Sequence, residues 1–407
     1  MLMYIERELE AQLKKYLEVK EIIAVVGSRQ CGKTTLIQNI LASLKNKKRI
    51  NTVSFDDVKQ LSLFEKDIDT FCDMHVKGYD LLFIDEVQYS KDSGKKLKYI
   101  YDKYPIKLLI TGSSSSELSL HSLKYLVGRI FIFTLYTFSF REFLKSKSAP
   151  LVEIYDRAKY LPSAVPELNK CLHEFMQYGG YPRVVLADTT EEKQIILKNI
   201  LNTYLLREIK EILGLKEDFK LLNLMKALSF QIGNLVNYSE LSNSTELPYA
   251  ELKNNLNILG KTYICSLVKP FQSNKRLELF KNPKVYFFDL GFRNILIDDF
   301  SIERSDLGAM YENFIFSELI KRDLTPKFWR TKSKAEVDFV LEINKEIIPI
   351  EIKASISDES ITRSFRSFIE KYSPQRGFIC SANFEGRLHV SNSEIYFVPF
   401  LKLIKQL

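Results

Sequence analysis

An eight-residue turn near the start of the chain limits the fold more than any other feature. The segment GSRQCGKT, residues 27–34, follows the apolar run IIAVV and opens the helical stretch TTLIQNILASL. Two glycines let the backbone wrap closely around an anion, and the loop amides and the helix N-terminus supply partial positive charge. The pattern GxxxxGK[ST] between a strand and a helix predicts a P-loop that binds a nucleoside triphosphate, most naturally ATP. The alternative is a coincidental glycine-rich turn.

Each position of this loop has an expected task. Lys33 is expected to reach the β- and γ-phosphates, and the Thr34 hydroxyl to bind Mg²⁺. The residues expected to contact the nucleotide are Gly27, Ser28, Arg29, Gln30, Cys31, Gly32, Lys33, Thr34 and Thr35.

The run LLFIDE, residues 81–86, supplies the expected second half of the site. Its apolar strand ends in two carboxylates, at the edge of the sheet where the P-loop is expected. Asp85 is expected to hold Mg²⁺ as part of the nucleotide-binding site, and Glu86 is expected to polarise the attacking water. Strands that end in Asp-Glu are common, so this pair gains its meaning from the loop upstream.

Two further segments offer groups that act on the γ-phosphate. In KLLITGSSSS, residues 107–116, Thr111 or Ser113 is expected at the polar sensor position of AAA+ ATPases, although both also suit an ordinary turn. In LVGRIFIF, Arg129 precedes a strand and is a candidate finger or sensor arginine, within its own subunit or toward a neighbour. A surface arginine explains Arg129 equally well.

Residues up to about 141 alternate short apolar runs with helical patterns. Continuous apolar runs are typical of parallel strands that are covered by helices on both faces. The runs expected to be strands are Ile22–Gly27, Arg49–Phe55, Asp80–Glu86, Lys107–Ser113 and Ile130–Leu135.

The length of 407 residues exceeds what one hydrophobic core supports. We expect an α/β chain with four parts: a P-loop AAA+ domain at 1–145, a helical connector at 146–215, a winged helix-turn-helix at 216–300 and an α/β domain at 301–407. The third part rests on three helices followed by a basic hairpin.

The segment EVDFVLEINKEIIPIEIKA, residues 336–354, places several charges on two adjacent strands. With INKE as the turn of an antiparallel hairpin, Asp338 comes near Glu351, and Lys353 lies on the same face as Glu351. Two carboxylates that close repel each other unless a cation lies between them, and Mg²⁺ prefers oxygen ligands. Lys353 would then lie beside the metal-bound water or the scissile phosphate.

Glu312, on the preceding helix, adds a third carboxylate. The candidate metal ligands are therefore Asp338, Glu351 and Glu312, and the candidate catalytic residues Asp338, Glu351 and Lys353. The order helix-Glu, strand-Asp, strand-ExK is the signature of the PD-(D/E)XK nuclease fold. A solvated charged hairpin explains the spacing nearly as well, and the spacing leaves phosphodiester cleavage open.

Basic residues decorate the expected wing, namely Lys269, Lys275, Arg276, Lys281 and Lys284. A wing that contacts phosphate needs such charge. The expected recognition helix carries Lys253, Asn254 and Asn257, which can face a groove. Winged helices also serve as packing or protein-contact modules, so DNA is one of two candidate partners and a protein is the other.

Composition narrows the class of protein. The net charge of +8 permits nucleic-acid binding without requiring it. The five cysteines and four histidines show no metal-ligand spacing, which argues against structural zinc and a disulfide framework. The first residues lack the apolar core of a signal peptide and no run suits a transmembrane helix, so we expect a soluble cytoplasmic protein. The sequence leaves monomer and homo-oligomer open.

Taken in order, the motifs resemble those of prokaryotic, often archaeal, ATPases with an N-terminal AAA domain (AAA_14) and a C-terminal domain called DUF4143. The resemblance spans nearly the full length, through GSRQCGKT, LLFIDEVQ, ITGSSSS, LVGR with FSFREF, YGGYPRVV, YLLREI, VYFFDLGFRN, EVDFVLEI and IPIEIKA. It implies an AAA+ ATPase core that uses ATP and Mg²⁺, a winged-helix segment and a PD-(D/E)XK-like tail.

Three functions follow as hypotheses. The first is an ATPase that acts on DNA through its winged helix and nuclease-like tail. The second is an ATP-driven signalling or protein-interaction switch whose nuclease-like fold is catalytically silent. The third is an ATPase whose tail only mediates oligomerisation.

Overall fold

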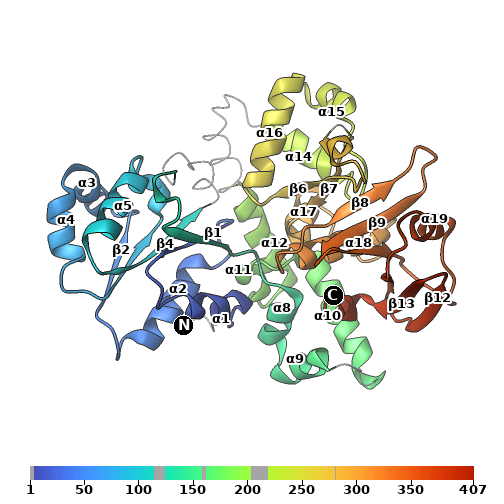
Figure 1. The fold of residues 1–407 in the computed structure, drawn as a ribbon, viewed down its shortest axis with the longest axis horizontal. Helices are drawn as coiled ribbons and strands as arrows, with labels where there is room; N and C mark the ends of the chain where they lie inside the picture. The colour runs from blue at the N-terminus through green and yellow to red at the C-terminus, as the bar shows by residue number, and fades with distance from the viewer. Residues whose placement is uncertain (1–3, 114–123, 158–161, 203–218, 280) are drawn as a thin grey trace. The chain divides into compact units, whose positions relative to one another are not determined.

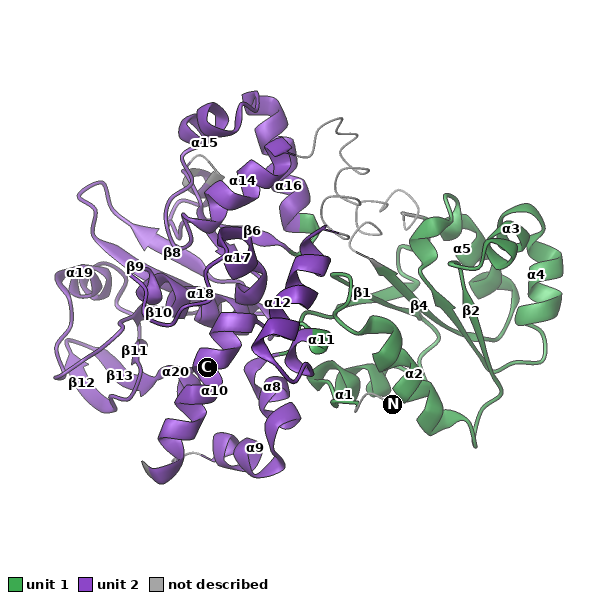
Figure 2. Cartoon of the chain, turned by 180° about the vertical axis from the view of Figure 1, so that it is seen from behind, with its two compact units in different colours: residues 1–138, 181–183, 261–263 green, residues 139–180, 184–260, 264–407 purple. Residues whose placement is uncertain are grey.

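The computed structural model describes residues 4–113, 124–157, 162–202, 219–279 and 281–407. The chain divides into two compact units, coloured separately in Figure 2. Unit 1 comprises residues 1–138, 181–183 and 261–263, and unit 2 comprises 139–180, 184–260 and 264–407. The expected division of the chain into four parts, with boundaries at 145, 215 and 300, stays a proposal. The motif YLLREI, residues 204–209, lies outside the described residues.

Unit 1 is built around a parallel sheet, as its apolar runs predict (Figure 1). The strand order is β2-β3-β4-β1-β5, and every neighbouring pair is parallel. The strands are β1 (Ile22–Gly27), β2 (Ile50–Ser54), β3 (Leu81–Asp85), β4 (Lys107–Ser113) and β5 (Ile130–Thr134). The helices are α1 (Glu8–Lys15), α2 (Lys33–Leu44), α3 (Val58–Lys66), α4 (Ile68–His75), α5 (Ser93–Lys103), η1 (Val87–Tyr89) and η2 (Lys124–Leu126).

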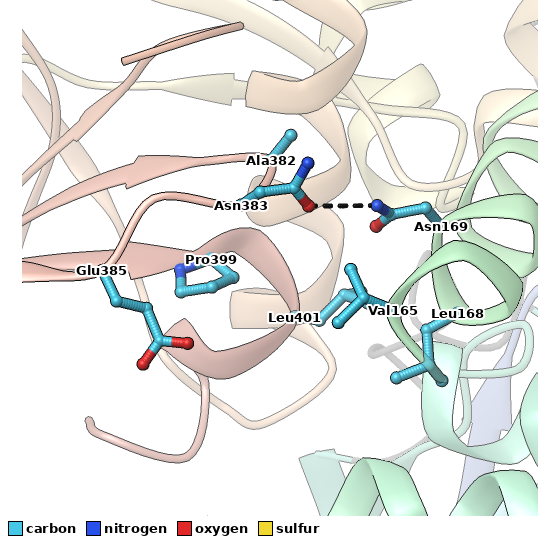
Figure 3. A pocket seen from close by; sticks show the side chains of 8 residues that line it. All are labelled: Val165, Leu168, Asn169, Ala382, Asn383, Glu385, Pro399 and Leu401. Atoms are coloured by element: carbon cyan, nitrogen blue, oxygen red, sulfur yellow. Dashed lines mark hydrogen bonds between the residues drawn. The ribbon is translucent and has the colours of Figure 1, made fainter. Parts of the chain in front are cut away.

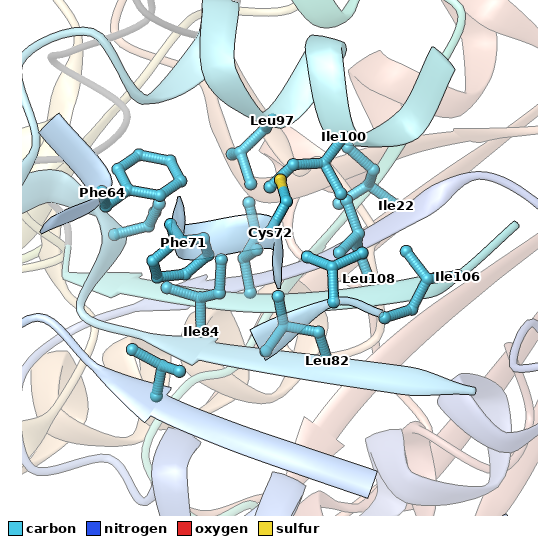
Figure 4. Packing of buried hydrophobic residues seen from close by; sticks show 14 of the residues in the cluster. Ile22, Phe64, Phe71, Cys72, Leu82, Ile84, Leu97, Ile100, Ile106 and Leu108 are labelled. Carbon is cyan, nitrogen blue, oxygen red and sulfur yellow. The ribbon is translucent and has the colours of Figure 1, made fainter. Parts of the chain in front are cut away.

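Two hydrophobic clusters, one on each face of this sheet, explain why its strands are apolar throughout. On β1, Ile22 and Ala24 belong to one cluster, whereas Ile23 and Val25 belong to the other. The first cluster packs β1, β3 and β4 against α3, α4 and α5, with Phe64, Phe71 and Leu97 among its members (Figure 4). A strand buried on both faces cannot show polar alternation.

Unit 2 begins with helices. They are α8 (Phe140–Lys147), α9 (Ala149–Asp156), η3 (Pro162–Ala164), α10 (Val165–Tyr178), α11 (Pro182–Val185), whose first two residues fall in unit 1, and α12 (Thr190–Asn199). The next elements are α14 (Phe219–Ser229), α15 (Tyr238–Thr245), α16 (Tyr249–Lys261), β6 (Cys265–Val268), η5 (Lys275–Leu279) and β7 (Lys284–Phe287), with β6 and β7 antiparallel. Three helices thus precede a two-stranded hairpin in this segment, and the winged helix-turn-helix expected at 216–300 stays a prediction.

The C-terminal part of unit 2 holds a mixed sheet in the order β12-β13-β11-β10-β9-β8. Its elements are α17 (Leu290–Ile297), α18 (Leu307–Ile320), β8 (Lys327–Arg330), β9 (Glu336–Ile343), β10 (Glu346–Ile352), α19 (Arg363–Tyr372), β11 (Arg376–Ser381), β12 (Gly386–Val390), β13 (Ser393–Pro399) and α20 (Phe400–Leu403). The expected hairpin is formed by β9 and β10, and Asn344 and Lys345 turn it with φ of 50° and 71°. Two consecutive positive φ values are typical of the type I′ hairpin turn.

The GGYP and FDLGF motifs join α10 to α17. The Gly180 amide donates to Asp289 Oδ2 at 2.8 Å, while Asp289 Oδ1 accepts from the Phe292 amide at the start of α17. A Cβ on Gly291 would lie 2.0 Å from the Tyr178 carbonyl oxygen. The two helix ends thus approach so closely that only glycine fits at this contact.

No described helix has both the length and the apolar character that crossing a membrane requires. All five cysteines are buried and unbridged.

We predict that Gly291→Ala destabilises unit 2, because the added methyl must push the Tyr178 backbone away. The expected loss is about 1–3 kcal/mol of unfolding free energy, measured by denaturant titration. Gly308→Ala, in α18, is the matched control, since nothing lies within 4 Å of its new Cβ. Equal stability of the two variants would contradict the close approach.

Candidate active site

The P-loop connects the end of β1 to the start of α2. Gly27 ends the strand with φ +152°, and a Cβ there would lie 2.0 Å from the Leu135 carbonyl oxygen. Gly32 has φ +95° directly before Lys33, the first residue of α2. The backbone therefore requires glycine at both ends of the GxxxxG turn, because a side chain is excluded at Gly27 and strained at Gly32.

The Lys33 side chain folds back over this loop and is only 5% exposed. Its Nζ donates to the carbonyl oxygens of Gly27 at 3.0 Å and Ser28 at 2.9 Å. Neutral carbonyls hold an ammonium less strongly than phosphate oxygens do. The head group is thus held inside the loop by partners that a phosphate can replace.

Asp85 and Thr34 meet at the carboxyl edge of the sheet. The Thr34 hydroxyl donates to the Asp85 carboxylate, with distances of 2.9 and 3.1 Å to its two oxygens, and the Thr111 hydroxyl donates to Oδ1. A hydroxyl and a carboxylate are oxygen ligands of the kind that Mg²⁺ takes. These residues fit the ion that the P-loop implies.

Glu86 directly follows β3 in an unusual backbone conformation. Its φ and ψ are 56° and 46°, in the left-handed region that few residues other than glycine adopt. The Glu86 amide donates to Thr111 Oγ1 at 3.3 Å, and its carboxylate accepts from the Gln88 side-chain amide. Thr111 therefore links the two acidic residues, and its role as a polar sensor stays a prediction.

The other predicted nucleotide contacts lie on or beside the loop. Ser28 and Cys31 are buried, and Gln30 has φ 58°. Arg29 donates to the Tyr89 hydroxyl at 3.0 Å, and Thr35 is exposed on α2. Ser113 ends β4 opposite Gly27 in the strand register.

Arg7 also supports the loop, although no motif in the sequence points to it. Its guanidinium donates to the carbonyl oxygens of Cys31 and Tyr136, each at 2.7 Å, and lies 4.8 Å from the centre of the Phe138 ring. Arg7 lies 24 residues from Cys31 and 129 residues from Tyr136 along the chain, so no local spacing in the sequence could indicate these two hydrogen bonds.

Arg129 lies at the opposite end of the sheet from the P-loop. Its carbonyl oxygen accepts from the Ile22 amide at the start of β1, whereas the P-loop follows the end of that strand. Its Nε lies 3.0 Å from Asp102 Oδ1. The expectation that Arg129 reaches the phosphates of its own P-loop is therefore corrected to the alternative, a surface ion pair. A role toward a neighbouring subunit stays a prediction.

The hairpin β9–β10 forms a second charged cluster, in unit 2. Its register places Asp338 beside Glu351, and Asp338 Oδ2 accepts from the Ile352 amide at 2.7 Å. Lys353 Nζ lies 2.7 Å from Glu351 Oε1, and Thr362 donates to the same carboxylate. The structure thus brings Asp338, Glu351 and Lys353 together.

Glu312 meets a lysine in this cluster. Its carboxylate accepts from Lys284 Nζ at 3.0 Å and from the Tyr286 hydroxyl. Among the described residues, no three His, Cys, Asp or Glu side chains are arranged to hold a metal ion. The metal set expected from Asp338, Glu351 and Glu312 is therefore corrected, because Glu312 pairs with Lys284.

Burial raises the pKa values of all three carboxyls. It raises the pKa of Asp338 against the opposing charge of Lys284, and the pKa of Glu351 against the hydrogen bond from Lys353. Burial and the charge of Asp338 raise the pKa of Glu312 to about 7, with Lys284 and Tyr286 opposing the change. Negative charge is thus crowded and poorly hydrated here.

The expected basic wing is also altered by the fold. Lys284 is buried and cannot contact DNA, and Lys275 pairs with Glu342 at 2.9 Å. Lys269, Arg276 and Lys281 are exposed. Two of the five basic residues expected to contact phosphate, Lys275 and Lys284, instead pair with acidic residues of β9 and α18 in unit 2.

Two cavities of unit 2 lie away from both clusters. One, of about 330 Å³, lies between α10 and the ends of β11 and β13, beside the Asn169–Asn383 hydrogen bond (Figure 3). The other, of about 1040 Å³, is lined by α10, α12 and residues near them. None of the predicted site residues lines either cavity.

The parallel sheet of unit 1 and the P-loop at its edge together identify the fold of unit 1 as an AAA-type P-loop ATPase fold. The phosphate loop follows β1, the acidic pair follows β3, and a polar residue of β4 lies between the two acids. The family comparison agrees, since residues 19–144 match an AAA domain (AAA_14), residues 169–303 match a domain of unknown function (DUF8612), and residues 307–400 match a domain of unknown function (DUF4143). The chain thus carries an AAA_14 match near its start and a DUF4143 match near its end, as the sequence resemblance predicts.

Relatives of similar length occur in bacteria and archaea. An uncharacterized protein of Haemophilus influenzae is 27% identical over 86% of each chain, and one of Methanocaldococcus jannaschii is 27% identical over 83% of this chain and 77% of its own. Among solved structures, a Walker-type ATPase of Pyrococcus abyssi is 14% identical with a TM-score of 0.44, covering 72% of this chain and 96% of that chain. AMPPCP-bound DnaA from Aquifex aeolicus is 16% identical with a TM-score of 0.29, covering 68% and 93%.

We predict that Thr111→Val slows nucleotide hydrolysis by about 10–100-fold with little change in nucleotide affinity. The substitution keeps the shape of the side chain but removes the hydroxyl that orients Asp85 and accepts from the Glu86 amide. Steady-state hydrolysis and nucleotide titration measure the two effects. An unchanged rate would show that Thr111 only packs in the strand.

Proposed function

We propose that unit 1 binds ATP with Mg²⁺ and hydrolyses the bond between the β- and γ-phosphates. The convergence of Lys33, Thr34, Asp85 and Thr111 at one edge of the sheet supports this function most directly. The loop amides, the α2 N-terminus and Lys33 would bind the phosphates, because each presents positive charge to the same point. Thr34 and Asp85 would hold Mg²⁺, which supplies charge neutralisation to the phosphates when bound.

Glu86 is the proposed base for the attacking water. Its carboxylate follows the strand that carries Asp85, and the Gln88 amide and the Thr111 hydroxyl fix its side chain and its backbone. The carboxylate would orient the water and take its proton as the oxygen attacks the γ-phosphorus, while the bond to the ADP oxygen breaks. The products are ADP and phosphate.

We predict that Lys33→Ala abolishes nucleotide binding, because the phosphates lose their only lysine in the loop. Glu86→Gln should keep ATP affinity and lower hydrolysis by about 10²-fold or more, because the amide cannot take the proton. Glu370→Gln, on the exposed face of α19, is the control. Calorimetric titration with ATP and phosphate release measure these effects, and retained turnover in Glu86→Gln would place the base elsewhere.

A second proposed function is DNA contact by α16 in unit 2. Lys253, Asn254 and Asn257 are exposed on one side of this helix. The Lys253 ammonium lies 4.5 Å from the centre of the Tyr249 ring and 5.7 Å from that of Tyr238, so two aromatic side chains support it. A supported cation with adjacent amides suits a backbone phosphate and a groove edge.

We predict that Lys253→Ala weakens DNA binding at every sequence tested and lowers the slope of log affinity against log salt by about 1. Lys332→Ala, an exposed lysine on another part of unit 2, is the control. Fluorescence anisotropy over a range of salt concentrations measures the slope. Weak wild-type binding without a salt slope would favour the alternative, an ATP-driven switch that contacts a protein partner.

A further inference from the structure

One lysine lies inside the carboxylate cluster of unit 2. Lys284 is the first residue of β7 and is only 2% exposed. Its Nζ lies 3.0 Å from Glu312 Oε1 on α18 and 2.6 Å from Glu336 Oε1 on β9. One ammonium thus joins the wing strand, the helix and the hairpin that together carry the cluster.

The surrounding acids keep this ammonium charged. Burial by itself lowers the pKa of Lys284, but the charges of Glu312, Asp338 and Glu336 outweigh burial, and the pKa of Lys284 is raised. A buried charge with such partners is costly to displace, because removing one partner leaves the others unpaired.

The other carboxylate positions in the cluster are also occupied. Glu351 pairs with Lys353 and accepts from Thr362, and Asp338 accepts from the Ile352 amide. Glu336 has a second cationic partner, Arg330, at 2.5 Å. A divalent cation would have to compete with side chains that the backbone already holds in place.

We propose that Lys284 is a built-in counter-ion that takes the position a divalent cation would need among Glu312, Glu336 and Asp338. This cluster then binds no divalent cation, although Asp338, Glu351 and Lys353 match the nuclease-like pattern of the sequence. A metal-activated water for phosphodiester cleavage cannot form there. The ammonium instead fixes the wing strand β7 to the sheet.

A contact next to Lys284 supports the fixing role. The Asn313 side chain accepts from the Phe287 amide at 2.7 Å and donates to the Phe287 carbonyl oxygen at 2.8 Å. Adjacent residues of α18, Glu312 and Asn313, therefore hold both ends of the short strand β7. The lysine and the asparagine together make β7 part of the C-terminal body.

The test counts Mn²⁺ bound to the full chain without nucleotide, by electron paramagnetic resonance of the free ion. A Thr34→Ala background removes a Mg²⁺ ligand of the P-loop, so bound ion reports on unit 2. We expect no stoichiometric Mn²⁺ when Lys284 is present. The Lys284→Met chain should bind about one Mn²⁺, at least about tenfold more tightly than the chain with Lys284. Adding Asp338→Asn to the Lys284→Met chain should remove this binding. Lys332→Met, far along the chain on an exposed turn, should gain none.

Two results would overturn the proposal. One is a Lys284-containing chain that binds one Mn²⁺ and loses it on Asp338→Asn. The other is a folded Lys284→Met chain that gains no ion. Should Lys284→Met fail to fold, the comparison of Asp338→Asn with its parent still decides, because it needs only the chain with Lys284 intact.

Discussion

The cost of removing a charged group from water determines the geometry of both charged sites in this chain. Buried ionised groups persist only with partners that replace their hydration. Asp85 is 8% exposed and is held by two hydroxyls, Thr34 and Thr111. Lys284 is 2% exposed and is held by two carboxylates. Each buried charge therefore fixes the elements that carry its partners, and the geometry of each site follows from that pairing.

The sequence was a good guide wherever a feature depends on neighbours along the chain. The five strands of unit 1 begin and end within one residue of their predicted bounds, because buried parallel strands are continuous apolar runs between polar turns. The P-loop and Asp85 follow for the same reason, since their positions are set by the ends of β1 and β3. The β9–β10 hairpin was predictable because Asn344 and Lys345 turn it.

The sequence failed where a side chain meets a partner far along the chain. Arg129 precedes a strand, but its distance from the P-loop depends on which end of β1 lies beside it, and strand direction decides that. Lys284 belonged by its spacing to an exposed basic wing, yet it pairs with Glu312, 28 residues away, and with Glu336. A single sequence shows that both charges exist but not that the fold buries them against each other.

Lys33 and Lys284 are both buried lysines, but their different partners suit one to bind phosphate and the other to hold secondary-structure elements together. Both are buried beside a strand end, but the partners of Lys33 are neutral carbonyl oxygens, whereas those of Lys284 are carboxylates. A phosphate offers Lys33 a charge-assisted bond in place of neutral ones, so exchange is favourable. Lys284 already has charge-assisted bonds, and the carboxylates around it would repel a new anion. The first lysine is therefore suited to exchange its carbonyl partners for phosphate oxygens, and the second to hold β7, α18 and β9 together.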